Sequence, residues 1–156
     1  MNPTLEMREN VRELLARVAM NLDNEAFDAF LADCNADFTY RVVAHSPELG
    51  LDMVWLDHDL NELKAMLKMV PQHVRMAGRL VRHLSTATVR AVTEDCAEAT
   101  ARILLVHTDP EGISRLLAVG TCVDTVAIND PAALKLMQRE VRFDTRDWSP
   151  GLHVPI

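Results

Sequence analysis

The sequence has little material for a disulfide framework or a phosphate-binding loop. Its three cysteines, Cys34, Cys96 and Cys122, lie far apart and never form a CxxC pair. An odd number at this spacing argues against a disulfide framework and a zinc knuckle, and is typical of buried thiols in a reducing cytoplasm. The five glycines are dispersed. No glycine-rich nucleotide loop, GxSxG nucleophile elbow or HExxH zinc motif occurs.

Positive charge is also scarce, and no apolar run is long. The chain has 16 Lys and Arg against 23 Asp and Glu, for a net charge of −7. This balance argues against nucleic acid or an anionic membrane as the main partner, because both require concentrated cations. No apolar run approaches the ~20 residues that span a bilayer, and residues 1–10 lack the apolar core of a secretory signal. We expect a cytoplasmic protein whose residues 1–156 form one domain, burying roughly 70% of its unfolded surface.

The second half of the sequence contains a series of long β-strand patterns. These runs are rich in Val, Thr, Ile and Leu and alternate partly between apolar and polar residues. Asp109-Pro110-Glu111-Gly112 is a turn between two of them, since proline presets φ and glycine accepts a positive φ. Strands joined by short turns pair antiparallel, so we expect a meander. The predicted strands are Val81–Thr93, Cys96–Thr108, Ile113–Ile128 and Leu134–Arg146.

The first half has helical patterns and two shorter strand candidates. Its first helix has an apolar stripe that starts at Leu5 and recurs near a 3.6-residue period. Helices followed by a meander predict an α+β fold, with the helices on one face of a curved sheet that forms a cone. Residues 72–80 fit no pattern. The predicted elements are a helix from the Thr4 cap to Leu22, a short helix after Asp23-Asn24, strands over Asp37–Val43 and Leu51–Leu56, and a helix from Asp57 or Asp59 to about Met69.

No local arrangement of histidines indicates a metal site. None of the six lies at i, i+4 from another, and none is beside a cysteine in a Rieske-type pattern. Asp57-His58-Asp59 places carboxylates next to an imidazole, as in a catalytic dyad. However, adjacent residues of a helix do not face each other, and Asp is a usual residue at a helix N-terminus. We favour a capping role for this motif.

Asp124 is the acid with the clearest chemical potential. On its strand it shares a face with Gly120, Cys122 and Val126, so its carboxylate is predicted to point into a partly apolar interior. Such a carboxyl group has a raised pKa and could serve as a general base. The other interpretation is that the two faces of the strand swap at a bulge, or that Asp124 pairs with an arginine such as Arg139. The sequence favours this second interpretation, in either of its two forms.

The last predicted strand has a charged face and an apolar face. The charged face is either solvated or part of an interface. Apolar residues that follow the strand favour an interface, because a free tail rarely carries so many. The charged face comprises Gln138, Glu140, Arg142, Asp144 and Arg146, and the tail contributes Trp148, Leu152, Val154 and Ile156.

Several short motifs, taken in order from about Val11 to Ile156, resemble one known family. Their order and spacing are similar to those of the small (β) subunits of Rieske-type aromatic-ring-hydroxylating oxygenases. The middle of the chain, from His45 to Arg79, departs from that family. The motifs are Leu22-Asp23, Phe27-Asp28-Ala29-Phe30, Asp37-Phe38-Thr39-Tyr40, Arg82-His83-Leu84, Gly120 with Asp124, and Arg139-Glu140-Val141-Arg142-Phe143-Asp144-Thr145.

The resemblance implies an NTF2-like cone and a non-catalytic structural subunit of a multicomponent oxygenase. In that case the large (α) subunit carries the Rieske 2Fe–2S cluster and the mononuclear Fe(II), and this chain carries no cofactor or metal. The resemblance also implies three α and three β chains, with the β chains forming a trimer. The departures indicate a divergent branch, with a small aliphatic or sulfonated substrate such as methanesulfonate. We expect subunit interfaces at Arg82, His83, Arg142, Asp144, Arg146 and Trp148.

Two other functions fit the same cone. A stand-alone NTF2-like isomerase or cyclase would use Asp124, Tyr40 or His83 as catalytic residues in the interior of the cone. A binding module without chemistry would instead hold a small ligand in an open pocket. Activity of the isolated protein, and its loss on Asp124→Asn, would distinguish the enzyme from the other two.

Overall fold

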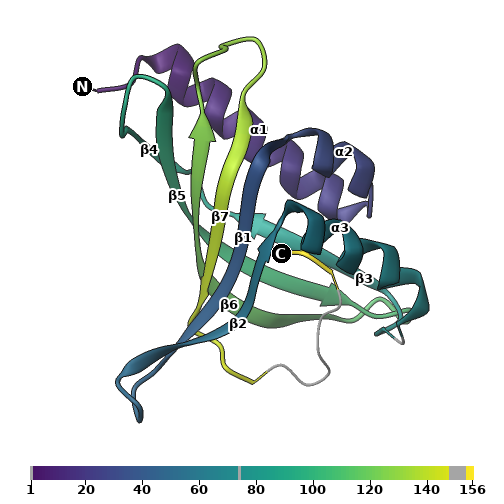
Figure 1. The fold of residues 1–156 in the computed structure, drawn as a ribbon. Coiled ribbons are helices and arrows are strands. Elements are labelled where there is room, and N and C mark those ends of the chain that lie inside the picture. Colours follow the sequence, from purple (N-terminus) through teal and green to yellow (C-terminus); the bar gives the residue numbers. More distant parts are fainter. Residues whose placement is uncertain (1, 74, 148–153) are drawn as a thin grey trace.

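A single strongly curved sheet forms the body of the fold, with the helices gathered on one side of it (Figure 1). The computed structural model describes residues 2–73, 75–147 and 154–156. The helices are α1 (Leu5–Asp23), α2 (Phe27–Ala32), α3 (Leu60–Met69) and the 3₁₀ turn η1 (Val70–Gln72). The strands are β1 (Cys34–Ser46), β2 (Leu51–Asp59), β3 (Arg79–Leu84), β4 (Thr88–Ala91), β5 (Cys96–Thr108), β6 (Ser114–Ala127) and β7 (Lys135–Phe143).

The strand order is β2-β1-β7-β6-β5-β3, with β4 also paired to β5. Strands β5, β6 and β7 form the predicted antiparallel meander. The α+β prediction, with helices on a curved and mainly antiparallel sheet, is therefore confirmed. One pairing is parallel, between β1 and β7, and its register places Tyr40 beside Arg139. This pairing brings the first strand of the chain next to the last.

The predicted strand Val81–Thr93 is wrong as a continuous element. It is two strands, β3 and β4, which pair with successive parts of β5. Between them Ser85 still contacts β5, since its amide donates to the Arg102 carbonyl oxygen at 2.9 Å and its hydroxyl accepts from the Arg102 amide at 2.9 Å. Ala87 is buried in this gap, and its carbonyl oxygen accepts from Arg12 Nε of α1 at 3.0 Å. The gap between β3 and β4 is therefore a place where this part of the chain contacts α1.

The turn predicted between β5 and β6 is present. Asp109 Oδ1 accepts from the amides of Glu111 at 3.1 Å and Ile113 at 2.9 Å. Gly112 has φ = 84°, in the left-handed region that glycine enters without a steric penalty. Both features are local, which is why the sequence alone identified this turn.

Asp59 is the N-cap of α3, and its carboxylate accepts from the Glu62 amide at 2.9 Å. The capping prediction is confirmed for this residue. The predicted helical start at Asp57 is wrong, because Asp57 and His58 lie on β2, paired with Arg41 and Tyr40 of β1. His58 instead contacts Glu62 one helical turn further on, at 3.1 Å.

The hydrophobic core lies between the helices and the concave face of the sheet. The Thr4 hydroxyl caps α1 by accepting from the Met7 amide at 3.1 Å, as predicted. Leu5 is an exception to the predicted stripe, because it is 66% exposed in the first turn of the helix. Phe30 of α2 packs edge-on against Phe38 of β1, with ring centroids 6.2 Å apart. The buried stripe of α1 consists of Val11, Leu14, Leu15, Val18, Ala19 and Leu22.

Candidate functional site

Asp124 and Arg139 form a buried ion pair in the interior of the cone. They lie opposite each other on β6 and β7. Arg139 Nε donates to Asp124 Oδ1 at 2.7 Å, and Nη2 donates to Oδ2 at 3.0 Å. Neither side chain is more than 2% exposed. The arginine pairing weighed for Asp124 from the sequence is therefore present.

The electrostatics of this pair favour an ion pair over a proton-transfer site. Burial is the largest single influence and disfavours the charge on Arg139, but the contacts of the guanidinium, chiefly those with Asp124, together outweigh burial and raise the Arg139 pKa. Both carboxylate oxygens accept from the same guanidinium in a planar two-bond contact, which is the strongest geometry for this pair. Asp124 therefore has a structural partner at each oxygen.

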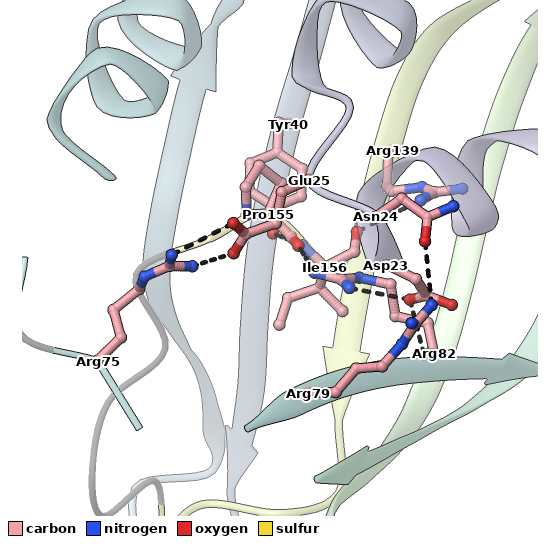
Figure 2. Close-up of polar contacts among 10 residues, drawn as sticks. All are labelled: Asp23, Asn24, Glu25, Tyr40, Arg75, Arg79, Arg82, Arg139, Pro155 and Ile156. Carbon is pink, nitrogen blue, oxygen red and sulfur yellow. Dashed lines mark hydrogen bonds and ion pairs between the residues drawn. The ribbon is translucent and has the colours of Figure 1, made fainter. Parts of the chain in front are cut away.

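The residues Pro155 and Ile156 occupy the interior of the cone next to this pair. Both are buried. The Ile156 amide donates to the Tyr40 hydroxyl at 2.9 Å, and Arg139 Nη1 donates to the Ile156 carbonyl oxygen at 3.3 Å. Figure 2 shows the segment surrounded by Tyr40, Arg139 and Arg82. Pro155 and Ile156 thus lie in the space in which a cone of this kind could hold a ligand.

A second buried ion pair holds the same segment from the other side. Arg82 of β3 donates to Asp23 Oδ1 through both its backbone amide and Nη1, each at 3.0 Å, and through Nη2 to the Pro155 carbonyl oxygen. The two side chains are at most 5% exposed. Burial lowers the Arg82 pKa, and the Asp23 contact opposes this change.

The other buried titratable groups near the segment are held in their neutral forms. Burial raises the pKa of Tyr40 to about 12. It also raises the pKa of the Cys122 and Cys34 thiols to about 12 each. A thiol with a raised pKa is a poor nucleophile, because the thiolate is the reactive form. These groups pack in the core in protonated form.

The structure brings two of the three residues weighed as catalytic to one place and leaves His83 apart from them. Asp124 and Tyr40 both contact the Arg139–Ile156 cluster. His83 is exposed on β3, whereas its neighbour Arg82 is buried, because successive side chains of a strand point to opposite faces. A triad of Asp124, Tyr40 and His83 does not form in this structure.

The predicted interface residues lie in two places. Arg82 is turned into the core. Arg142 of β7 contacts Asp52 of β2 at 2.7 Å and Glu140 of β7 at 2.8 Å. This part of the charged face therefore contacts side chains of its own sheet. Asp144 contacts Arg102 at 2.9 Å and Arg146 contacts Glu48 at 2.7 Å, both at the surface. Trp148 lies outside the described residues. Ile156, expected at an interface, packs instead in the chain's own core.

A cavity of about 590 Å³ opens beside the inserted segment. The described residues that line it are Leu22, Asp23, Asn24, Glu25, His73, Arg75, Met76, Gly78, Arg79, Leu80, Arg82, His107 and Val154. Sequence reasoning placed Arg82 at a subunit interface and missed Arg75 and Arg79, because residues 72–80 show no helical or strand pattern. The signal that could have identified them is the recurrence of arginine at Arg75, Arg79 and Arg82.

In the part of the chain that the structure describes, no group of three or more His, Cys, Asp or Glu side chains could hold a metal ion. Among the same residues, no helix is long and apolar enough to cross a membrane.

Known proteins with the same curved sheet and helical cover identify the class of this fold. A family model of the SnoaL-like domain matches residues 3–134. The β subunit of a candidate aromatic-ring-hydroxylating dioxygenase from Novosphingobium aromaticivorans has the same fold, with a TM-score of 0.82 at 18% identity over 96% of each chain.

Two relatives narrow this class. The β subunit of 2-aminobenzenesulfonate 2,3-dioxygenase from an Alcaligenes species is 35% identical, over 94% of this chain and 97% of the relative. The hydroxylase β subunit of methanesulfonate monooxygenase from Methylosulfonomonas methylovora is 32% identical, over 94% of this chain and 85% of the relative. The chain therefore belongs to the SnoaL-like β subunits of Rieske-type ring-hydroxylating and sulfonate oxygenases.

Proposed function

We propose that this β subunit is a non-catalytic scaffold of an oxygenase hydroxylase. The observation that carries the proposal is the filled interior of the cone. Pro155 and Ile156 occupy it, and two buried arginine–aspartate pairs and Tyr40 bind the backbone of that segment or lie against it. Among the described residues of the sheet, Asp124 is the buried acid, and Arg139 engages both of its oxygens. An interior arranged in this way supports stability of the fold and engages both oxygens of Asp124 within the chain.

The partner in this proposal is an α subunit, which the β-subunit relatives imply by name. It carries the 2Fe–2S cluster and the mononuclear Fe(II). Three α and three β chains assemble in the cytoplasm around a trimer of this chain, whose residues 1–156 act as one domain. The exposed candidates His83, Asp144 and Arg146, the half-buried Arg142, and Trp148 contribute to the subunit interfaces.

The substrate class in this proposal is an organic sulfonate. Both curated relatives are named for sulfonates, 2-aminobenzenesulfonate in one case and methanesulfonate in the other. The two substrates differ in their organic part, aromatic in one and a single methyl group in the other. The two substrates share the sulfonate group. We therefore propose that the hydroxylase containing this chain acts on a substrate with a sulfonate group.

Co-expression with the α chain tests the scaffold. We expect a heteromeric complex on size-exclusion chromatography, with iron and sulfonate oxygenation present only when α is present. Asp124→Asn should lower the yield of folded complex but leave turnover per bound iron unchanged. Turnover by this chain alone, with loss of that turnover in a folded Asp124→Asn variant, would establish the isomerase or cyclase function instead. A β chain that never associates with α would contradict the scaffold.

A further inference from the structure

Three arginines face three consecutive residues at the turn between α1 and α2. Arg82 contacts Asp23 at 3.0 Å, Arg79 Nη2 donates to Asn24 Oδ1 at 3.0 Å, and Arg75 contacts Glu25. Figure 2 shows these contacts side by side. Two of the three arginines face carboxylates, and the middle one faces a neutral amide. The set therefore carries one positive charge more than it carries negative charge.

Arg79 has no carboxylate partner within ion-pair distance among the described residues. The residues outside the described part, Met1, Val74 and those from 148 to 153, include no Asp or Glu. Its guanidinium is exposed and lines the cavity of about 590 Å³. In a chain with a net charge of −7, this is a local site of opposite sign.

Arg82 supplies a second, independent observation. It lines the same cavity and is only 6% exposed. Its Nε is buried and has no hydrogen-bond partner among the described residues. A buried donor without a partner costs roughly 1–3 kcal/mol, more when it is charged. An acceptor that reached Nε from the cavity would remove that cost.

The cavity also has an apolar wall, and its lining residue Gly78 packs closely against β5. Leu22, Leu80 and Val154 line it beside the arginines. Gly78 has φ = 111°, and a Cβ there would collide with the Thr108 carbonyl oxygen, so the segment carrying Arg79 packs directly against β5. Apolar surface next to fixed cations suits a ligand with an apolar body and an anionic head.

We propose that this cavity binds a small organic oxyanion, such as an aryl sulfonate or carboxylate, with Arg79 and Arg82 at the anionic head and Leu22, Leu80 and Val154 along the apolar body. Arg79 is the main determinant, because its charge is not balanced by a carboxylate. The arginine fork matches the oxygens of a sulfonate or carboxylate in two-bond contacts. The site is distinct from the interior beside Asp124, and it does not depend on the scaffold role.

Calorimetric titration of the full-length chain with benzenesulfonate tests the site. We expect saturable binding that weakens as salt is raised, that is shared by benzoate, and that is not shown by benzyl alcohol. Arg79→Gln should weaken binding by about tenfold or more, whereas Arg79→Lys should retain part of the affinity. Arg90→Gln is the matched control, since Arg90 is an exposed arginine on β4 paired to Glu98, and it should bind as the wild type does.

Three results would overturn the proposal. One is the lack of saturable benzenesulfonate binding by the wild-type chain. Another is equal affinity in Arg79→Gln, with circular dichroism and thermal unfolding confirming that the variant is folded. The third is inorganic sulfate binding as tightly as benzenesulfonate, which would indicate simple ion association without the apolar wall. Co-purification with the α chain is unaffected by any of these results, so the two proposals fail separately.

Discussion

Asp124 and Arg139 face each other across β6 and β7 and share two hydrogen bonds, of 2.7 and 3.0 Å, in the interior of the cone. The same guanidinium reaches the Ile156 carbonyl oxygen at 3.3 Å. One buried arginine therefore links the last two strands of the meander to the inserted end of the chain. Removal of its carboxylate partner would leave a buried cation unpaired.

The first prediction concerns this pair. Asp124→Asn should lower the free energy of unfolding by about 3–5 kcal/mol, because the Arg139 charge loses its compensation while it stays buried. Chemical denaturation measures this change. The double variant Asp124→Leu with Arg139→Met should recover most of the loss, since an apolar pair of similar volume carries no desolvation penalty.

The control for this variant is Glu98→Gln at the exposed Arg90–Glu98 pair. Its effect should stay below about 1 kcal/mol, as for other surface ion pairs. An Asp124→Asn variant as stable as the wild type would show that Asp124 is dispensable for the fold. The ion pair would then have to be assigned a role other than stability.

The second prediction concerns the inserted segment. Ile156 is 5% exposed and belongs to the main core. Ile156→Ala should lower the free energy of unfolding by about 2–4 kcal/mol, since it removes buried methyl and methylene groups and leaves a cavity. Leu116→Ala is the matched control at a leucine that is 58% exposed, where the change should be within about 0.5 kcal/mol. Equal effects of the two substitutions would contradict the insertion.

The third prediction concerns Tyr40, the only tyrosine in the sequence. Burial raises its pKa from 10.0 to about 12. The phenolate absorbance near 295 nm should therefore appear at a pH about two units higher in the folded protein than in the unfolded chain. Between these two values the unfolded chain binds fewer protons than the folded protein. The contribution of Tyr40 to the free energy of unfolding is therefore fully present below pH 10, and it is lost as the pH rises toward 12. Titration of the folded protein with a midpoint at 10 would show that Tyr40 is exposed to water.

The fourth prediction concerns Gly120 on β6. A Cβ at this position would lie 2.5 Å from the Arg142 carbonyl oxygen and 3.0 Å from the Phe143 ring. The oxygen belongs to the neighbouring strand and cannot move without disturbing the ladder. Gly120→Ala should therefore lower the free energy of unfolding by about 1–3 kcal/mol. Thermal unfolding measures this, with Thr121→Ala on the opposite face of the same strand as the control.

The fifth prediction tests the proposed subunit interface. Arg142→Glu reverses a charge on the surface network of β7, and it should reduce co-purification with the α chain at physiological salt. Arg115→Glu, at the exposed Arg115–Asp109 pair near the β5–β6 turn, is the control. If both variants co-purify as the wild type does, the charged face of β7 is a solvated surface.

Much of the fold could be predicted from local patterns. The cap at Thr4, the cap at Asp59 and the turn at Asp109–Gly112 depend on residues within a few positions of each other, and all three are present. The placement of Asp124 on the inner face of its strand follows from a two-residue period, and it is correct. The division of Val81–Thr93 could not be predicted, because Ala87 contacts Arg12, 75 positions earlier in the chain.

The sequence by itself determined the α+β class, the meander, the inward carboxylate and the family, since periodicity, turn chemistry and ordered motifs are properties of the chain alone. Only the tertiary structure decided that Tyr40 lies beside Arg139 and that Pro155 and Ile156 fill the cone. It also decided that Arg75, Arg79 and Arg82 meet Glu25, Asn24 and Asp23. Those contacts join residues 50 or more positions apart, and no local pattern specifies them; they arise because the curved sheet brings the end of α1, β3 and the end of the chain to one place.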